Sequence, residues 1–162
     1  MKKRILALVM ILVSLFSLAS CALFPVYNSL DLESMLQGYG YIVDTVDGNL
    51  NEGITGYVHA YKTDSDDYLY YIYCENLSTA NKIYKYFKTQ NEAEVAALKM
   101  KLERASYALN DATDIDGSKK LNYFEIYLDA QYELEKAENF KCGYFANVVW
   151  YGTKQAVADI KQ

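Results

Sequence analysis

The single histidine, His59, is the residue best suited to acid–base chemistry in this chain of 162 residues. It lies in an alternating run, in which a period of two places Tyr57 and Tyr61 on the same side of a strand. Catalysis would need a nucleophile or a carboxylate beside His59, and a zinc site would need Cys74 and Cys142 nearby. The sequence has no Cys-x-x-Cys pair, no glycine-rich phosphate loop, and no Gly-x-Ser-x-Gly or His-Glu-x-x-His motif. We therefore expect a protein that is not an enzyme, and catalysis by His59 with a carboxylate or Cys74 is the weakest alternative.

Tyrosine is the second residue type of interest, because the 17 tyrosines of the chain could form a binding surface. Two strand-like runs, 54–62 and 68–74, flank a polar loop and predict a hairpin. A loop centred on Ser65 would place His59 opposite Tyr71. One face would then carry the following aromatic residues: Tyr57, His59, Tyr61, Tyr71 and Tyr73. Such a face suits sugar rings or peptides, since a phenol joins a flat apolar body to a hydrogen-bonding tip. The alternative is that helices cover these tyrosines as core.

Residues 114–125 resemble the loop of an EF-hand calcium site. The expected oxygen ligands are Asp114, Asp116, Ser118, the carbonyl of Lys120, Asn122 and bidentate Glu125. Lys119 departs from the pattern, because glycine normally occupies this sixth position and adopts its strained turn. The resemblance therefore implies calcium binding no tighter than about 10⁻⁴ M, and a simple polar turn between two helices is the alternative. No other cofactor is expected.

The first 21 residues resemble the signal peptide of a bacterial lipoprotein. Three basic residues, 2–4, precede an apolar run over residues 5–18. The run ends in Leu18-Ala19-Ser20-Cys21, which is similar to a lipobox. The resemblance implies cleavage before Cys21 and attachment of a lipid anchor, with palmitate-type acyl chains, to its thiol. The mature protein would then lie on the outer face of the bacterial cell membrane. An uncleaved spanning helix over residues 5–24 is the alternative.

Removal of residues 1–20 leaves 142 residues with 13 Lys and Arg against 21 Asp and Glu, a net charge of about −8. Such a charge repels phosphate backbones, so we expect no nucleic-acid partner. The length suits one domain. We expect a tether over residues 21–34 and a single domain over residues 35–162 that folds alone. Cys74 and Cys142 could form a disulfide in an external compartment or remain buried thiols.

The hydrophobic pattern predicts an α+β fold. A short helix (31–37), a strand (41–46) and the hairpin 54–62/68–74 come first, and a second hairpin (140–145/148–152) and a final helix capped by Thr153 come last. Between the hairpins, residues about 79–138 predict two antiparallel helices. The seam of the first helix would consist of Val95, Leu98, Leu102, Ala105 and Leu109, and that of the second would consist of Leu121, Phe124, Leu128 and Leu134. We expect an antiparallel sheet with helices on one face and this helical hairpin inserted.

The C-terminal segment 148–157 is similar to the strand-to-helix turn of small uncharacterised lipoproteins of low-GC Gram-positive bacteria, a resemblance that implies no activity. Together with the lipobox, it predicts a membrane-anchored, surface-exposed lipoprotein. We expect a non-enzymatic binding or accessory module for a peptide, protein or sugar of the cell envelope. The alternatives are a weak calcium-binding structural module and, last, an envelope enzyme that uses His59.

Overall fold

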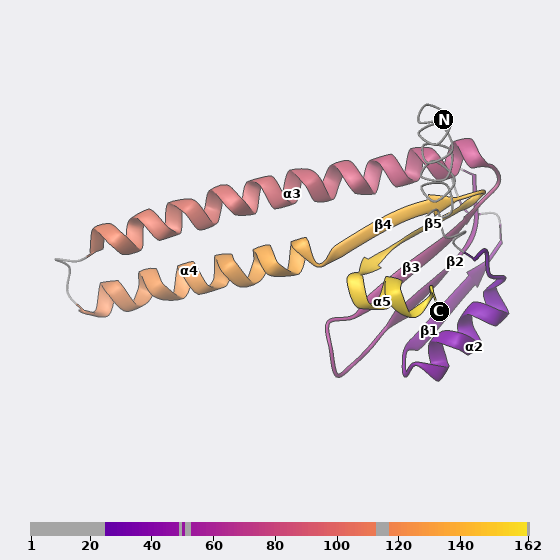
Figure 1. Ribbon diagram of the computed structural model, residues 1–162, viewed down its shortest axis with the longest axis horizontal. Helices are drawn as coiled ribbons and strands as arrows, with labels where there is room; N and C mark the ends of the chain where they lie inside the picture. Colours follow the sequence, from indigo (N-terminus) through magenta and orange to yellow (C-terminus); the bar gives the residue numbers. More distant parts are fainter. Residues whose placement is uncertain (1–24, 49, 51–52, 113–116, 162) are drawn as a thin grey trace, which may run out of the picture.

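The computed structural model describes residues 25–48, 50, 53–112 and 117–161. Its strands form one antiparallel sheet in the order β1-β2-β3-β5-β4 (Figure 1). The strands are β1 (Ile42–Asp47), β2 (Ile54–Tyr61), β3 (Tyr68–Cys74), β4 (Phe140–Phe145) and β5 (Val148–Thr153), and the helices are α2 (Ser29–Gly38), α3 (Leu77–Asp111), α4 (Gly117–Glu138) and α5 (Lys154–Asp159). The predicted α+β class, with a helical hairpin inserted between two sheet hairpins, is confirmed. Among the described residues, no helix is both long and apolar enough to span a membrane.

Helices α2 and α5 cover one face of the sheet, as expected. The core on this side includes fully buried side chains from both helices and from the central strands, such as Leu32, Tyr71 and Ala156. Asn28 caps α2 and Thr153 caps α5, each through its side-chain oxygen. The predicted cap at Thr153 is therefore confirmed.

The folded domain begins earlier than the sequence predicted. The Tyr71 hydroxyl donates to the Pro25 carbonyl and accepts from the Tyr27 amide, both at 3.2 Å. Leu32 of α2 has no exposed surface. The boundary at residue 35 is therefore wrong, because it cuts α2 and removes part of the core. Composition suggested a tether here, whereas burial of one face of α2 decides that the domain extends at least to Pro25.

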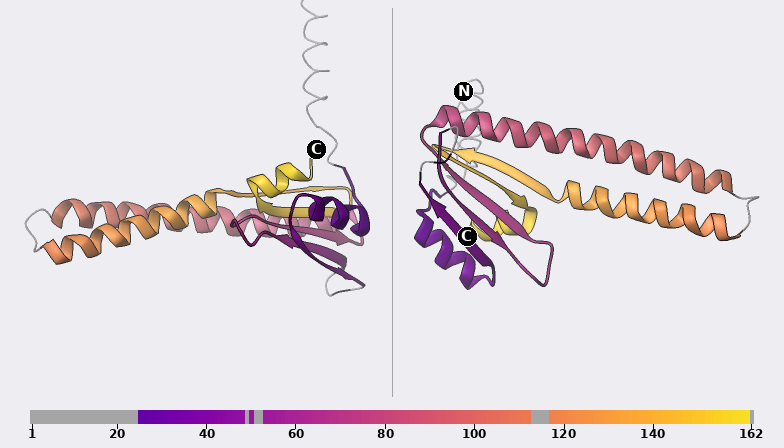
Figure 2. Two further views of the ribbon diagram at one scale, coloured as in Figure 1. Left: turned by 90° about the horizontal axis from the view of Figure 1, so that it is seen from below. Right: turned by 180° about the vertical axis from the view of Figure 1, so that it is seen from behind.

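The first turns of α3 cover part of the opposite sheet face. Ala80 is buried there with Ile72, Cys74 and Val149, and Ile83, Tyr84 and Phe87 pack around them. Beyond these turns α3 leaves the sheet. It continues beside α4 as an antiparallel arm that projects from the domain (Figures 1 and 2). Ion pairs Lys99–Glu138 and Lys101–Glu133 join the two helices near the domain.

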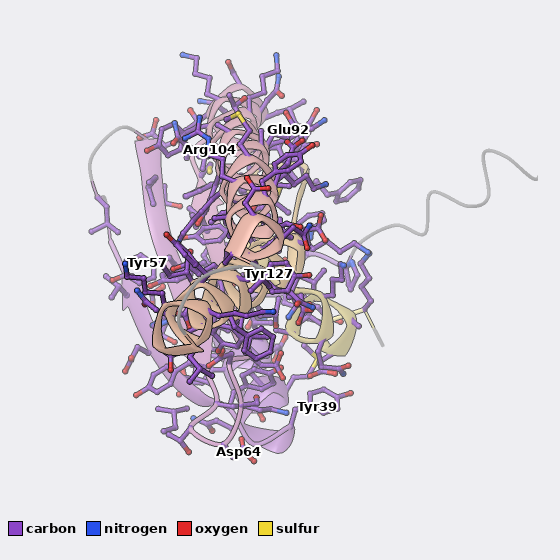
Figure 3. The ribbon with its side chains drawn as sticks, turned by 90° about the vertical axis from the view of Figure 1, so that its left-hand side faces the viewer. Tyr39, Tyr57, Asp64, Glu92, Arg104 and Tyr127 are labelled. Atoms are coloured by element: carbon purple, nitrogen blue, oxygen red, sulfur yellow. The ribbon has the colours of Figure 1, made fainter. Side chains whose placement is uncertain are left out.

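The predicted packing stripe is correct for α3 but mostly wrong for α4. In α3, the predicted stripe from Val95 to Leu109 is half-buried or buried against α4, so it is confirmed. In α4, Leu121, Phe124 and Leu128 are exposed, and the prediction is wrong for these three. The buried or half-buried stripe of α4 consists of Tyr123, Tyr127, Ala130, Leu134 and Ala137, and Tyr127 is labelled in the end-on view of the arm (Figure 3). Small Ala130 and Ala137, opposite α3, permit closer helix packing than Phe124 or Leu128 would.

Candidate functional site

The register of the first hairpin decides which aromatic residues share a face. His59 pairs with Tyr70 and Tyr61 pairs with Tyr68, so the loop contains six residues, 62–67. The Lys62 amide closes it by donating to the Asp67 carbonyl. This register differs by one residue from the predicted one, and a shift of one moves every side chain of a strand to the other face.

Tyr71 and Tyr73 are therefore wrong as members of the predicted surface. They lie on the face that α2 and α5 cover, where Tyr71 has no exposed surface. Burial raises the pKa of the Tyr71 hydroxyl to about 12. Tyr57, His59 and Tyr61 do share a face, and their new neighbours are Tyr68 and Tyr70 of β3 and Tyr151 of β5.

These six residues form a row of rings across three strands, which we call the aromatic row: Tyr57, His59, Tyr61, Tyr68, Tyr70 and Tyr151. The ring of Tyr70 stacks on His59 at 4.2 Å and on Tyr151 at 4.9 Å between centroids. Tyr151 in turn lies 4.0 Å from the ring of Phe87 on α3. The rings in the middle of the row stack on one another, so only their edges and hydroxyl groups remain available to a ligand. The row is therefore better suited to be a wall beside a site than a platform for stacking.

Among the described residues, His59 lies beside a carboxylate and two tyrosine rings but not beside Cys74 or Cys142. Its described contacts are the rings of Tyr61 and Tyr70 and, at 3.9 Å, the carboxylate of Asp44. Cys74 lies four residues beyond the partner of His59 on β3, about 13 Å along the strand. Cys142 lies two strands away from Tyr70, across β5. The alternatives that combined His59 with these cysteines are therefore wrong.

Both cysteines are free thiols in the structure. Burial raises the pKa of the Cys74 thiol to about 11, which keeps it protonated at neutral pH. Since the thiolate is the reactive form, Cys74 is suited to packing and not to nucleophilic attack. Burial also raises the pKa of Cys142.

A large hollow lies on the same sheet face, where the arm meets the domain. This cleft has a volume of about 950 Å³, near the upper end of the range for ligand sites. Its walls come from α3, from the last turns of α4, from the β2–β3 loop and from the start of α5. Rings from four elements line it: Tyr68, Phe87, Tyr132 and Phe140. Tyr68 also belongs to the aromatic row, so the row and the cleft are continuous.

The polar lining of the cleft is rich in carboxylates and amides. The carboxylates are Asp66, Glu94, Glu133, Glu135 and Glu138, the amides are Gln90, Asn91 and Asn139, and the ammonium groups are Lys136 and Lys154. Glu94 has no ion-pair partner among the described residues, whereas Glu133 and Glu138 pair with lysines of α3. Burial raises the pKa of Tyr68, and the charge of Glu94 adds to this effect.

The β2–β3 loop is fixed to both sides of the cleft. Asp66 accepts a hydrogen bond from the Tyr132 hydroxyl at 3.0 Å and lies 3.4 Å from the ammonium of Lys136. These two contacts lower the pKa of the Asp66 carboxyl. On the other side, the Thr153 hydroxyl donates to Asp67 at 2.7 Å. The loop therefore connects α4 to the cap of α5 across the cleft.

The described part of the calcium-like segment is helical. Asp114, Asp116 and the side chain of Ser118 lie outside the described residues, but α4 begins at Gly117 and contains Lys119 and Glu125. Glu125 is exposed on this helix, seven residues after Ser118, which is about 10 Å along the axis. An EF-hand arrangement would require the first two turns of α4 to unwind. Weak calcium binding stays a prediction.

Sequence reasoning missed most of this site because its members are far apart in the chain. The alternation in residues 68–74 could have placed Tyr68 and Tyr70 beside His59, had the loop length been known. Nothing local connects Phe87, Glu94 and Tyr132, which the arm brings together. No protein-family model, curated protein or solved structure matches this chain, so the site must be interpreted from its own geometry.

Proposed function

We propose that this protein is a lipid-anchored, non-enzymatic binding module on the outer face of the bacterial cell membrane. The signal sequence and lipobox support the location, and two acyl chains on Cys21 would make the attachment stable. Cys21 itself lies outside the described residues. Only three residues lie between it and Pro25, whose carbonyl bonds to buried Tyr71, so the chain allows the anchor to lie no farther than about 14 Å from the folded domain. The folded domain would therefore lie close to the membrane.

The observation that carries the binding role is the combination of rings and planar polar groups in one cleft. A sugar ring has apolar faces that pack on aromatic side chains and hydroxyls that bond to carboxylates and amides. Phe87, Phe140 and Tyr68 provide the first kind of surface, and Glu94, Asn91 and Gln90 provide the second. We infer an oligosaccharide of the cell envelope as the ligand, because the cleft joins this lining to a volume that holds more than one sugar unit. The cleft replaces the flat tyrosine face as the expected binding site.

Glu94 offers a matched test, because Glu92 lies on the same helix two residues away and outside the cleft. We expect Glu94→Gln to weaken binding of soluble peptidoglycan glycan fragments at least tenfold and Glu92→Gln to leave it unchanged. Calorimetric titration with these fragments, and with neutral hexose oligomers for comparison, measures the effect. Equal affinity of wild type and Glu94→Gln for every oligosaccharide, or no binding at millimolar concentration, would contradict the proposal.

A further inference from the structure

The outer side of α4 carries an exposed apolar stripe. At its start, Leu121 and Phe124 border a small hollow with Leu109 of α3, and at its end Tyr132 borders the cleft. The stripe consists of Leu121, Phe124, Leu128 and Tyr132, spaced by three, four and four residues. Their exposed fractions are 65%, 46%, 45% and 59%. Only the hydroxyl tip of Tyr132 is engaged, through its hydrogen bond to Asp66. Soluble proteins rarely expose large apolar side chains in a continuous line unless a partner covers them.

The stripe is distinct from the surface that holds the arm together. On the helical wheel of α4 it lies about 140° from the stripe that packs on α3, given 100° per residue. Stability of the arm therefore does not account for these four residues, because α4 already buries Tyr127, Ala130 and Leu134 toward α3. The spacing is that of a helix that meets another helix.

Charges beside the stripe indicate what covers it. Glu125 and Asp129 follow its edge along the middle of α4, and Glu135 lies at its far end. None of the three forms an ion pair with another described residue. Lys119 and Lys120 lie just before the stripe, at the end nearest the tip of the arm, and Lys136, one turn beyond Tyr132, is already paired with Asp66. A complementary partner therefore carries basic residues along most of its length.

A second copy of the chain fits this pattern poorly. An antiparallel pairing of two stripes sets the Glu125 and Asp129 edge of one copy against the same edge of the other, and like charges oppose that contact. A parallel pairing is also unfavourable, because it would press the two β2–β3 loops against each other. Each loop lies beside the stripe, where Asp66 is bonded to Tyr132 and Lys136.

We propose that this stripe is a docking surface for an amphipathic helix of another protein, with large apolar residues on one face and lysine or arginine beside them. Because Leu121, Phe124 and Leu128 lie on the arm and outside the cleft lining, a partner could dock on them while the cleft holds its ligand. The order of charges along α4 also gives the bound helix one preferred direction. This surface meets the cleft at Tyr132 and Glu135, but Leu121, Phe124 and Leu128 lie outside the cleft lining, and the proposal does not depend on the sugar-binding function.

Two labelled synthetic helices with the same leucine face test the charge argument: one has lysines beside that face and the other has glutamates. The full chain is held in nanodiscs of zwitterionic lipid, and empty nanodiscs are the blank. Fluorescence anisotropy should show binding of the lysine helix and at least tenfold weaker binding of the glutamate helix. Rising salt should weaken the first complex, and a Glu125→Gln, Asp129→Asn double variant should reduce that salt dependence.

Exposed positions on α4 provide variants that leave the fold intact, which circular dichroism verifies. Phe124→Ser and Leu128→Ser should each weaken binding of the lysine helix at least tenfold, while Asn122→Ser, exposed on another side of α4, should not change it. Equal binding of the two helices, or full affinity in both serine variants, would overturn the proposal. Disulfide dimers formed by Leu128→Cys but not by Asn122→Cys in native membranes would also overturn it, because they would assign the stripe to a second copy.

Discussion

Adding one methyl group at Gly152 should destabilise the sheet more than any comparable change at an exposed glycine. A Cβ at this position would lie 2.1 Å from the carbonyl oxygen of Tyr68 and 2.9 Å from the Cα of Leu69. Both are backbone atoms of β3, the strand to which Gly152 is paired. A backbone cannot rotate away as a side chain can, so β5 would have to separate from β3 at this end.

The expected cost follows from this geometry. Overpacking a core typically costs about 1–3 kcal/mol when side chains can adjust. Separation of the strands would also weaken nearby backbone hydrogen bonds, at about 1 kcal/mol each. We therefore expect Gly152→Ala to lower the free energy of unfolding by at least about 3 kcal/mol, out of the roughly 5–15 kcal/mol typical of folded domains. The next residue, Thr153, lines the cleft, so ligand binding should weaken as well.

Gly38→Ala is the matched control, because a Cβ there meets no atom within 4 Å. Gly38 is the last residue of α2 and has no positive φ. Alanine should stabilise the protein by about 0.4–1 kcal/mol at such a site, since it restricts the unfolded chain. Urea denaturation of both variants, followed by circular dichroism, measures the two effects. A Gly152→Ala protein within 0.5 kcal/mol of wild type would refute the close approach of β5 to β3.

Four further outcomes are expected. The free energy of unfolding should fall as pH rises from about 10 toward 12, because tyrosines such as Tyr71 ionise at lower pH in the unfolded state than when buried. The fall is up to about 1.4 kcal/mol per pH unit for each such tyrosine. Denaturant titration at pH 8 and pH 11 checks the sign. A fragment of residues 35–162 should be less stable than one of residues 25–162 by about 3 kcal/mol or more, because it lacks buried Leu32; equal thermal midpoints would restore the original boundary. Cys21→Ser should abolish lipid attachment and leave an unprocessed precursor, whereas mass spectrometry that finds an unmodified cysteine in wild-type membranes would contradict the lipobox. Calorimetry should detect no calcium binding tighter than about 10⁻⁴ M, and micromolar affinity would show that the start of α4 unwinds.

Local signals in the sequence determined the elements of this fold. Alternation identified the runs that became β2 and β3, and the strand at residues 140–145 was placed at its observed bounds. Thr153 was identified as a helix cap because its hydroxyl needs only the amide of Ala156, three residues away. The inward stripe of α3 was also correct, since Val95 to Leu109 is the one continuous apolar stripe of that segment. Each of these features depends on neighbours within about one helical turn or one strand.

Tertiary structure decided which surfaces of those elements face one another. In the first hairpin, the hydrogen bond from the Lys62 amide to the Asp67 carbonyl closes a six-residue loop. The resulting register differs by one residue from the predicted one, so Tyr71 lies in the core and not on the expected surface. In α4, the sequence contains two apolar stripes, and the packed α3 seam selects the one with small alanines. The cleft depends on both decisions, because it brings Tyr68, Glu94 and Tyr132 together from β3, α3 and α4. Residues so far apart in the chain leave no periodic signal, since they become neighbours only where the arm joins the domain.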